Sequence, residues 1–179
     1  MQMHLKAKRH IIMNSTSSPN TSFGSFKRNK MPNLIEYGFF TVLLAFTGVQ
    51  EKTINRLAPT IIQESKVNNL EPELVAAVIQ VESSWYPRAE SEAGACGLMQ
   101  VIPKWNPKKD GTLYTCEELK DPKTNIKAGT KALRWWIDQA KGDVPLALCA
   151  YNAGYTCFKK MRHSYVKRVM NVYYTIKKK

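Results

Sequence analysis

From Thr53 onward, apolar residues recur at spacings of three and four, which is the pattern of amphipathic helices. This periodicity predicts helices over residues 53–66, 72–84, from 121 to about 137, over 143–153 and from 160 into the C-terminal tail. Glycine and proline punctuate residues 88–116, which we expect to be rich in loops. No stretch alternates like a strand, so the pattern predicts an all-α domain with room for a small irregular β element in the 94–116 loop.

The N-terminal part of the chain has a different composition. Residues 1–33 are polar, basic and rich in Ser, Asn and Thr, so we predict a disordered basic extension. The uncharged run Tyr37–Val49 is shorter than the roughly 20 residues that a membrane-spanning helix needs, but it fits the apolar region of a secretory signal. We therefore predict a signal peptide or a short membrane anchor at residues 34–50, with Met13 or Met31 as alternative starts. The other interpretation is a core helix of the main domain.

One carboxyl group stands where the helical pattern predicts burial. Val75, Val78, Ile79 and Glu82 fall on one helical face, so three aliphatic side chains are followed by an acid. Burial and the negative end of a helix both raise a carboxyl pKa, and a glutamate that is protonated near neutral pH can act as a general acid. The alternative is a helix-end glutamate that faces solvent or pairs with Arg88.

The chain carries a formal net charge of +13, which indicates a polyanionic partner. The segment Lys159–Lys179 is strongly basic and contains no acid. Such a surface suits nucleic acid, an anionic membrane surface or an anionic wall polymer. We do not expect nucleic acid, because the chain lacks a basic motif interleaved with aromatics and a recognisable binding fold.

Four cysteines leave two interpretations open. They contain no Cys-x-x-Cys motif, and the three histidines supply no useful ligand spacing, so no metal site and no cofactor is predicted. One or two disulfides formed in an oxidising compartment is one interpretation, and partly buried free thiols is the other. Three pairings are compatible with the sequence, and the residues concerned are Cys96, Cys116, Cys149 and Cys157.

Four ordered segments and a weaker fifth resemble the lytic transglycosylase catalytic domain of the goose-lysozyme-like branch of the lysozyme superfamily. They are Gln80–Trp85, Gly94–Pro103, Asp121–Gly129 and Ala150–Gly154, followed by Tyr165–Val169. Each segment alone is weakly specific, but all occur in the family's order and approximate spacing. The resemblance implies a mainly helical, lysozyme-like catalytic domain over residues 53–176.

The resemblance makes Glu82 the sole catalytic acid and base. In this family such a glutamate protonates the glycosidic oxygen between N-acetylmuramic acid and N-acetylglucosamine. It then removes the proton of the muramyl C6 hydroxyl, and a 1,6-anhydro ring forms without water. The second carboxylate of ordinary glycosidases is absent from the family, and neither Glu90 nor Glu92 is marked as a partner.

The resemblance also assigns residues to the substrate groove, namely Ser83, Met99, Gln100, Tyr151, Asn152 and Tyr165. Four of them have a plainer structural interpretation: a hydroxyl bonded to backbone for Ser83, a core side chain for Met99, a helix cap for Asn152 and a half-buried ring for Tyr165. The family's tyrosine is expected to hydrogen-bond the catalytic carboxyl, and we expect this bond to favour the protonated acid.

Two departures from the family's pattern affect these expectations. Met161–Ser164 stands where the family usually has a Glu-Thr pair, so the sequence does not define which residues support Tyr165. Cys96 and Cys149 replace small residues beside two motifs, which places them near the groove. We hypothesise a Cys116–Cys157 disulfide that ties the 105–118 loop to the far side of the cleft.

The sequence thus predicts an exported peptidoglycan lytic transglycosylase of the periplasm or cell envelope, with peptidoglycan glycan strands as its partner. A hydrolytic muramidase of the same fold is the nearest alternative, and a non-catalytic wall-binding module is an alternative of another class. Membership of a secretion or conjugation machine, or of a bacteriophage, is compatible with these features.

Overall fold

The computed structural model describes Gly38, Thr41 and residues 49–178. The predicted extension over residues 1–33 and most of the predicted signal or anchor over 34–50 lie outside the described residues. Among the residues that the structure describes, no helix combines the length and hydropathy needed to cross a bilayer.

Two helices open the described domain. Helix α2 spans Glu51–Val67, and helix α3 spans Pro72–Ser83. Proline is favourable at the first position of α3 because that residue needs no backbone donor. A run of six residues from Leu74 to Ile79 is buried, so α3 is enclosed on every side along its middle. The helix ends before Pro87, because Ser84 and Trp85 both adopt left-handed backbone conformations, with φ of 49° and 66°.

A loop-rich stretch follows, as the glycine and proline residues predicted. It contains the short 3-10 helix η1 (Pro103–Trp105) and the one-turn helix α4 (Cys116–Leu119). Helix α5 (Pro122–Gln139) begins at Asp121, whose side chain accepts a hydrogen bond from the backbone N–H of Thr124.

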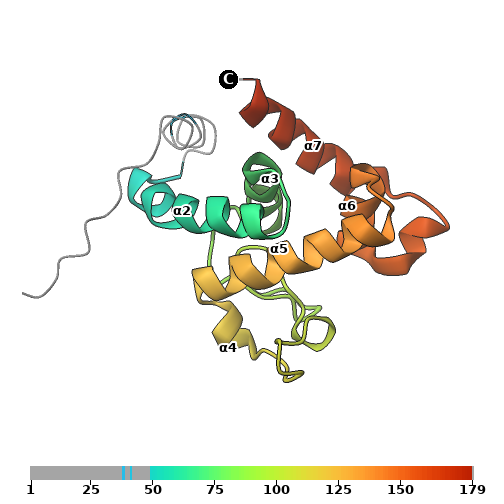
Figure 1. Ribbon diagram of the computed structural model, residues 1–179, viewed down its shortest axis with the longest axis horizontal. Coiled ribbons are helices and arrows are strands. Elements are labelled where there is room, and N and C mark those ends of the chain that lie inside the picture. Colours follow the sequence, from blue (N-terminus) through green and yellow to red (C-terminus); the bar gives the residue numbers. More distant parts are fainter. Residues whose placement is uncertain (1–37, 39–40, 42–48, 179) are drawn as a thin grey trace, which may run out of the picture. The chain divides into compact units, whose positions relative to one another are not determined.

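The C-terminal part contains helix α6 (Val144–Ala153), the 3-10 helix η2 (Gly154–Phe158) and helix α7 (His163–Lys177). Gly154 has φ of 67° and ends α6, as predicted. The last helix begins at His163 rather than at residue 160, because the chain first makes the η2 turn. In Figure 1, α3 lies between α2 and α7, and α5 runs across their base. Helix α7 packs on α3, which brings the C-terminal helix against the first half of the domain, and α5 packs on α6.

The all-α prediction is confirmed, because residues 49–178 contain no β-strand. The small irregular β element consists of two isolated antiparallel bridges, Glu90 with Cys96 and Cys96 with Val101. It therefore begins slightly before the predicted 94–116 region.

The hypothesised Cys116–Cys157 disulfide is wrong. Cys96 pairs with Cys116 and Cys149 pairs with Cys157, and the described residues contain no free cysteine. The loop that contains the two β-bridges brings Cys96 close to Cys116 at the start of α4, and their Cα atoms are 5.6 Å apart. The η2 turn folds Cys157 back onto α6, which brings its Cα to 5.8 Å from that of Cys149. Both distances are normal for disulfides.

Candidate active site

Glu82 lies in the last turn of α3, where the chain leaves the apolar core. Its side chain is half-buried, and the hydroxyl of Tyr165 on α7 donates to Glu82 Oε1 at 2.6 Å. Tyr165 itself is 3% exposed. The packing of α3 on α7 thus brings together an acid and a phenol that are far apart in the sequence.

Burial raises the pKa of Glu82 above its ordinary value. The hydrogen bond from Tyr165 and the positive charge of Arg168 act in the opposite direction, and burial is the larger effect. The expectation that Tyr165 favours the protonated acid is therefore wrong. A donor that points at a carboxylate oxygen stabilises the ionised form, so Tyr165 orients Glu82 while it lowers the pKa.

Two tyrosine side chains near Glu82 remain neutral donors. The pKa values of Tyr165 and Tyr151 are raised well above 10.0, first by burial and then by the negative charge of Glu82. The Tyr151 hydroxyl donates to the backbone carbonyl of Met99 at 2.8 Å. This bond links the end of α6 to the glycine-rich loop. Asn152, the next residue, is exposed.

Ser83 joins α3 to the same loop. Its hydroxyl lies 2.8 Å from the carbonyl oxygen of Leu98 and 3.2 Å from that of Ile79. The plainer interpretation of Ser83, a hydroxyl bonded to backbone, is therefore confirmed. A hydroxyl that donates one hydrogen bond can still accept others, so Ser83 can also accept from a bound ligand.

The loop residues Met99 and Gln100 take different positions. Met99 is fully buried, and its side chain covers Gly129, where an added Cβ would lie 2.5 Å from the Met99 sulfur. Its side chain is thus a core element, and its backbone carbonyl faces Tyr151. Gln100 is half-buried, and its amide nitrogen donates to the carbonyl oxygens of Gly97 and Ala89 at 3.0 and 3.3 Å. Direct substrate contacts by these two residues stay predictions.

Asn125 positions the loop, although it was not among the site residues predicted from the sequence. This fully buried side chain on α5 donates to the carbonyls of Cys96 and Leu119, both at 2.8 Å, and accepts from the N–H of Met99 at 2.7 Å. The available signal was a polar residue within the Asp121–Gly129 motif, on the face that buries Ile126 and Gly129.

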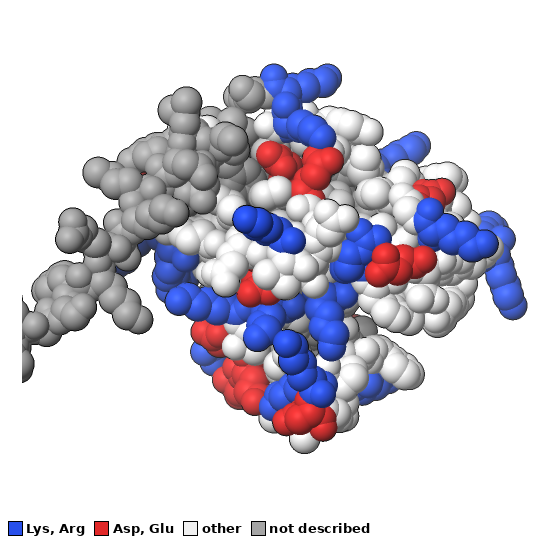
Figure 2. Space-filling view, viewed as in Figure 1, with Lys and Arg blue, Asp and Glu red and all other residues white. Residues whose placement is uncertain are grey.

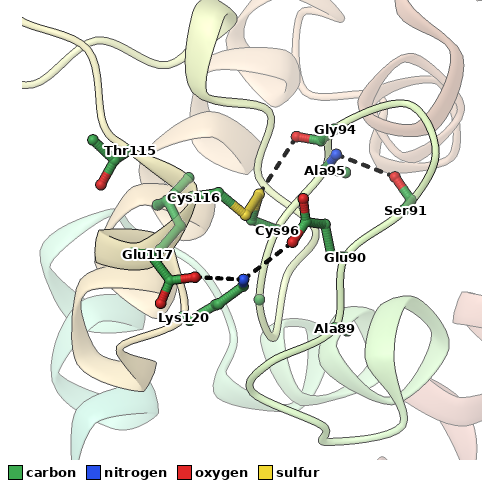
Figure 3. The surroundings of a disulfide bond; sticks show 12 residues. Ala89, Glu90, Ser91, Gly94, Ala95, Cys96, Thr115, Cys116, Glu117 and Lys120 are labelled. Carbon is green, nitrogen blue, oxygen red and sulfur yellow. Dashed lines mark hydrogen bonds and ion pairs between the residues drawn. A yellow bond between two sulfur atoms is a disulfide. The ribbon is translucent and has the colours of Figure 1, made fainter.

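Two other acids near the loop, Glu90 and Glu117, are engaged in ion pairs. Figure 3 shows the ammonium group of Lys120 between Glu90 and Glu117, at 3.1 and 2.6 Å, beside the Cys96–Cys116 disulfide. Glu90 and these two sulfurs lie within 4.8 Å of one another, but sulfurs joined in a disulfide are not thiolate ligands for a metal. Among the described acids with a resolved pKa shift, Glu82 is the one whose pKa is raised.

The chain is similar to several bacterial and phage proteins. It is 44% identical over 81 residues to the transglycosylase of Enterobacteria phage PRD1, a match covering 45% of this chain and 28% of the relative. It is 36% identical over 90 residues to the soluble lytic murein transglycosylase of Escherichia coli K12, covering 44% and 13%. It is 30% identical over 132 residues to the membrane-bound lytic murein transglycosylase F of Pasteurella multocida, covering 67% and 26%. The chain thus spans less than a third of each relative.

Solved structures show the same fold. The 70 kDa soluble lytic transglycosylase in complex with bulgecin A superposes with a TM-score of 0.62 at 21% identity, over 80% of this chain and 28% of that one. An inactive mutant of the lytic transglycosylase Slt from Pseudomonas aeruginosa gives a TM-score of 0.52 at 29% identity, over 66% and 21%. The model of the transglycosylase SLT domain matches residues 59–171, a span that contains Glu82, Tyr151 and Tyr165. The chain therefore belongs to the transglycosylase SLT domain family.

Proposed function

We propose that the protein is a peptidoglycan lytic transglycosylase that cleaves the β-1,4 bond between N-acetylmuramic acid and N-acetylglucosamine. The observation that carries the proposal is Glu82, a half-buried acid with a raised pKa that is held by the hydroxyl of Tyr165 within an SLT domain. Relatives named as lytic murein transglycosylases support the choice of substrate.

The reaction needs one group that first gives and then takes a proton. Protonated Glu82 donates to the glycosidic oxygen, and the bond from this oxygen to the muramyl C1 breaks. The resulting carboxylate removes the proton from the muramyl C6 hydroxyl, whose oxygen forms the new bond to C1. Atoms balance without water, and Glu82 returns to its protonated state. Burial favours the first step, and the Tyr165 hydroxyl stabilises the carboxylate between the steps.

The residues around Glu82 supply candidate substrate contacts. Ser83 lies next to the acid, and its hydroxyl oxygen can accept from an acetamido N–H of the sugar. Asn152 is exposed beside Tyr151 and can bond a sugar hydroxyl. Gln100 keeps its amide oxygen for a ligand, because the loop carbonyls engage its nitrogen. A direct contact of Met99 with the sugar stays a prediction; its carbonyl accepts from Tyr151 and its side chain packs on Gly129.

The test is digestion of purified peptidoglycan followed by mass spectrometry of the fragments. We expect 1,6-anhydro-muropeptides that vanish in Glu82→Gln, with Glu92→Gln as a matched control on the exposed loop. Fragments with reducing ends, each heavier by one water, would identify a muramidase. Binding without any cleavage would identify a wall-binding module.

The basic surface suggests how the enzyme stays on its substrate. Figure 2 shows Lys and Arg side chains over much of the visible face, with Asp and Glu in smaller groups. We propose that this charge retains the protein on anionic wall polymer or on an anionic membrane surface. Comparison of wall polymer with and without its anionic groups tests the first partner, and vesicles with and without anionic lipid test the second.

We also propose that the protein is exported to the cell envelope, where peptidoglycan is found. The two disulfides support this location, because disulfides persist in oxidising compartments. Fractionation of producing cells, with mass analysis of the mature N-terminus, tests export and cleavage within residues 34–50. The similarity to a phage transglycosylase makes a phage particle a second location to assay.

A further inference from the structure

Four aromatic side chains form a partly exposed cluster. It joins Trp135 and Trp136 of α5 to Tyr155 and Phe158 of η2. The Tyr155 ring lies 5.2 Å from that of Trp136 and 5.8 Å from that of Phe158, and the two tryptophan rings are 4.6 Å apart. Trp135 is 45% exposed, Tyr155 61% and Phe158 39%. Contiguous exposed aromatics of this kind mark binding surfaces more often than single ones do.

Two contacts fix the η2 turn that carries Tyr155 and Phe158 of the cluster. The Cys149–Cys157 disulfide ties η2 to α6, and Cys157 is 3% exposed. The Thr156 hydroxyl donates to the carbonyl of Ala153 at 2.9 Å, which fixes the same turn. The rings of Tyr155 and Phe158 are therefore presented by a cross-linked turn, so a ligand loses little free energy in ordering them.

The segments that carry the cluster also carry Tyr151 and Gly129, which connect to the residues around Glu82. Tyr155 follows Tyr151 by four positions, so their Cα atoms lie at most about 15 Å apart along the chain. Trp136 lies two turns after Gly129 on the same face of α5, a rise of about 10 Å. Gly129 packs against Met99, whose carbonyl accepts from Tyr151. The segments that carry the aromatic rings are therefore linked, through Tyr151 and Gly129, to residues next to the candidate acid.

The chemistry of the cluster suits a carbohydrate polymer. The C–H faces of pyranose rings are apolar and pack on aromatic rings, while Tyr and Trp keep a polar group at the edge for sugar hydroxyls. The rings of Trp136 and Trp135 meet the Tyr155 ring at steep angles of 68° and 87°. The Phe158 ring is tilted by 33° to Trp136 and by 37° to Tyr155, so the cluster offers ring faces in several orientations. Exposed Lys159 and Lys160 follow Phe158 directly and can face the carboxylates of peptidoglycan.

We propose that Trp135, Trp136, Tyr155 and Phe158 form an aromatic platform that binds sugar rings of the glycan strand away from the bond being cleaved. This inference rests on the proposed function, because it takes the same polymer as its ligand. The platform favours long strands over short fragments, since a short fragment fills the site at Glu82 without reaching the rings. Its contribution is to substrate affinity and to chain-length preference.

Binding is measured in the Glu82→Gln background, which separates affinity from cleavage. The probe is peptide-free glycan strands in a long and a short size class, titrated by calorimetry. Adding Trp135→Ala or Tyr155→Ala is expected to weaken binding of long strands about tenfold, with a much smaller effect on short ones. Trp135→Phe keeps a ring and should keep most of the affinity. Tyr174→Ala, on an exposed α7 tyrosine outside the cluster, is the matched control and should bind like its parent.

Folding of each variant is checked by thermal unfolding. Unchanged binding of long strands by folded Trp135→Ala and Tyr155→Ala variants would overturn the platform. So would equal losses for long and short strands, or losses confined to self-association or to binding of phosphatidylglycerol vesicles. The proposed function fails separately: if the active protein releases no anhydro products while the tenfold loss is observed, the platform stands and the lyase assignment falls.

Discussion

At the scale of single residues, the surroundings of Glu82 set its proton affinity through opposing effects. Apolar packing along α3 disfavours the ionised carboxylate, whereas the Tyr165 hydroxyl and Arg168 favour it. Arg168 also lies over the Tyr165 ring, with its guanidinium carbon 5.8 Å from the ring centroid. An acid that must donate and then accept a proton benefits from both influences, because neither protonation state is then strongly disfavoured.

Replacement of Glu82 is expected to make stability less dependent on pH. The folded-state pKa is raised, so the folded protein holds this proton more tightly than the unfolded chain does. That stabilisation is fully present below pH of about 4.5, the ordinary value, and is lost as pH rises through the folded pKa. Glu82→Gln cannot ionise, so its Tm should exceed that of the parent at pH 7 by more than at pH 4. A Tm difference independent of pH would contradict this expectation.

At the scale of elements, the segment from Gly94 to Val101 depends on contacts from three helices. Asn125 of α5 holds its backbone, Ser83 of α3 bonds Leu98, and Tyr151 of α6 bonds Met99. The loop is therefore positioned by buried and partly buried hydrogen bonds rather than by a sheet. Loss of one buried bond leaves an unpaired polar group, which costs about 1–3 kcal/mol.

Two glycines of this loop are expected to respond differently to alanine. Gly97 has φ of 75°, and an added Cβ would overlap the Asn125 side chain and the Leu119 carbonyl. Gly94 has a similar φ of 76°, but nothing lies within 4 Å of its Cβ position. Gly94→Ala should therefore cost only the backbone strain, about 1–2 kcal/mol. Gly97→Ala should cost at least about 3 kcal/mol and reduce cleavage strongly. Denaturant unfolding compares the two, and equal losses would show that the Asn125 contact is unimportant.

The two disulfides cross-link segments that carry candidate site residues, the loop of Met99 to α4 and the α6 helix of Tyr151 to η2. Cys96–Cys116 closes a separation of 20 residues and Cys149–Cys157 one of 8. From loop-closure entropy we expect that replacing the Cys96–Cys116 pair by alanine lowers the free energy of unfolding by about 3 kcal/mol. The same replacement of the Cys149–Cys157 pair should lower it by about 2.5 kcal/mol. Loss of Cys149–Cys157 should also lower glycan affinity, because it frees η2. Unfolding of the protein with and without reductant measures the combined stabilisation by the two disulfides. Retention of the full Tm after complete reduction would contradict the prediction.

At the scale of the whole molecule, the chain combines a net charge of +13 with helices that gather the candidate site residues from distant segments. Several acids that are present are already paired, for example Glu71 with Lys177 at 2.6 Å and Glu118 with Lys108 at 2.7 Å. The remaining positive charge is free to act on a polyanion, and exposed charges act over about 10 Å at 0.1 M salt.

Retention on insoluble peptidoglycan that carries anionic polymer is therefore expected to fall as salt rises. We expect most of the Glu82→Gln variant to pellet with the polymer at 50 mM salt, and substantially less at 500 mM. Removal of the anionic polymer should reduce this salt dependence, and the carboxylates of the peptidoglycan itself should account for what remains. Retention that stays constant with salt would exclude an electrostatic contribution.

Periodicity and local chemistry were enough to predict the five long helices, whereas the catalytic role of Glu82 was predicted only through the resemblance to the family. The apolar face of α3, Pro72 at its start and Gly154 after α6 act within a few residues, so their effects are readable from sequence. The ordered motifs likewise indicated the family and placed Glu82 within it.

Tertiary structure decided what depends on contacts between distant segments. The disulfide pairing, the burial of Met99 over Gly129 and the role of Asn125 follow from how the loop lies on α5. The direction of the Tyr165 effect on the pKa of Glu82 depends on which group donates and on how much apolar surface surrounds the acid. Sequence by itself determined the elements and the family, because those rest on local patterns; the electrostatics and the aromatic cluster required the packing, because distance sets both.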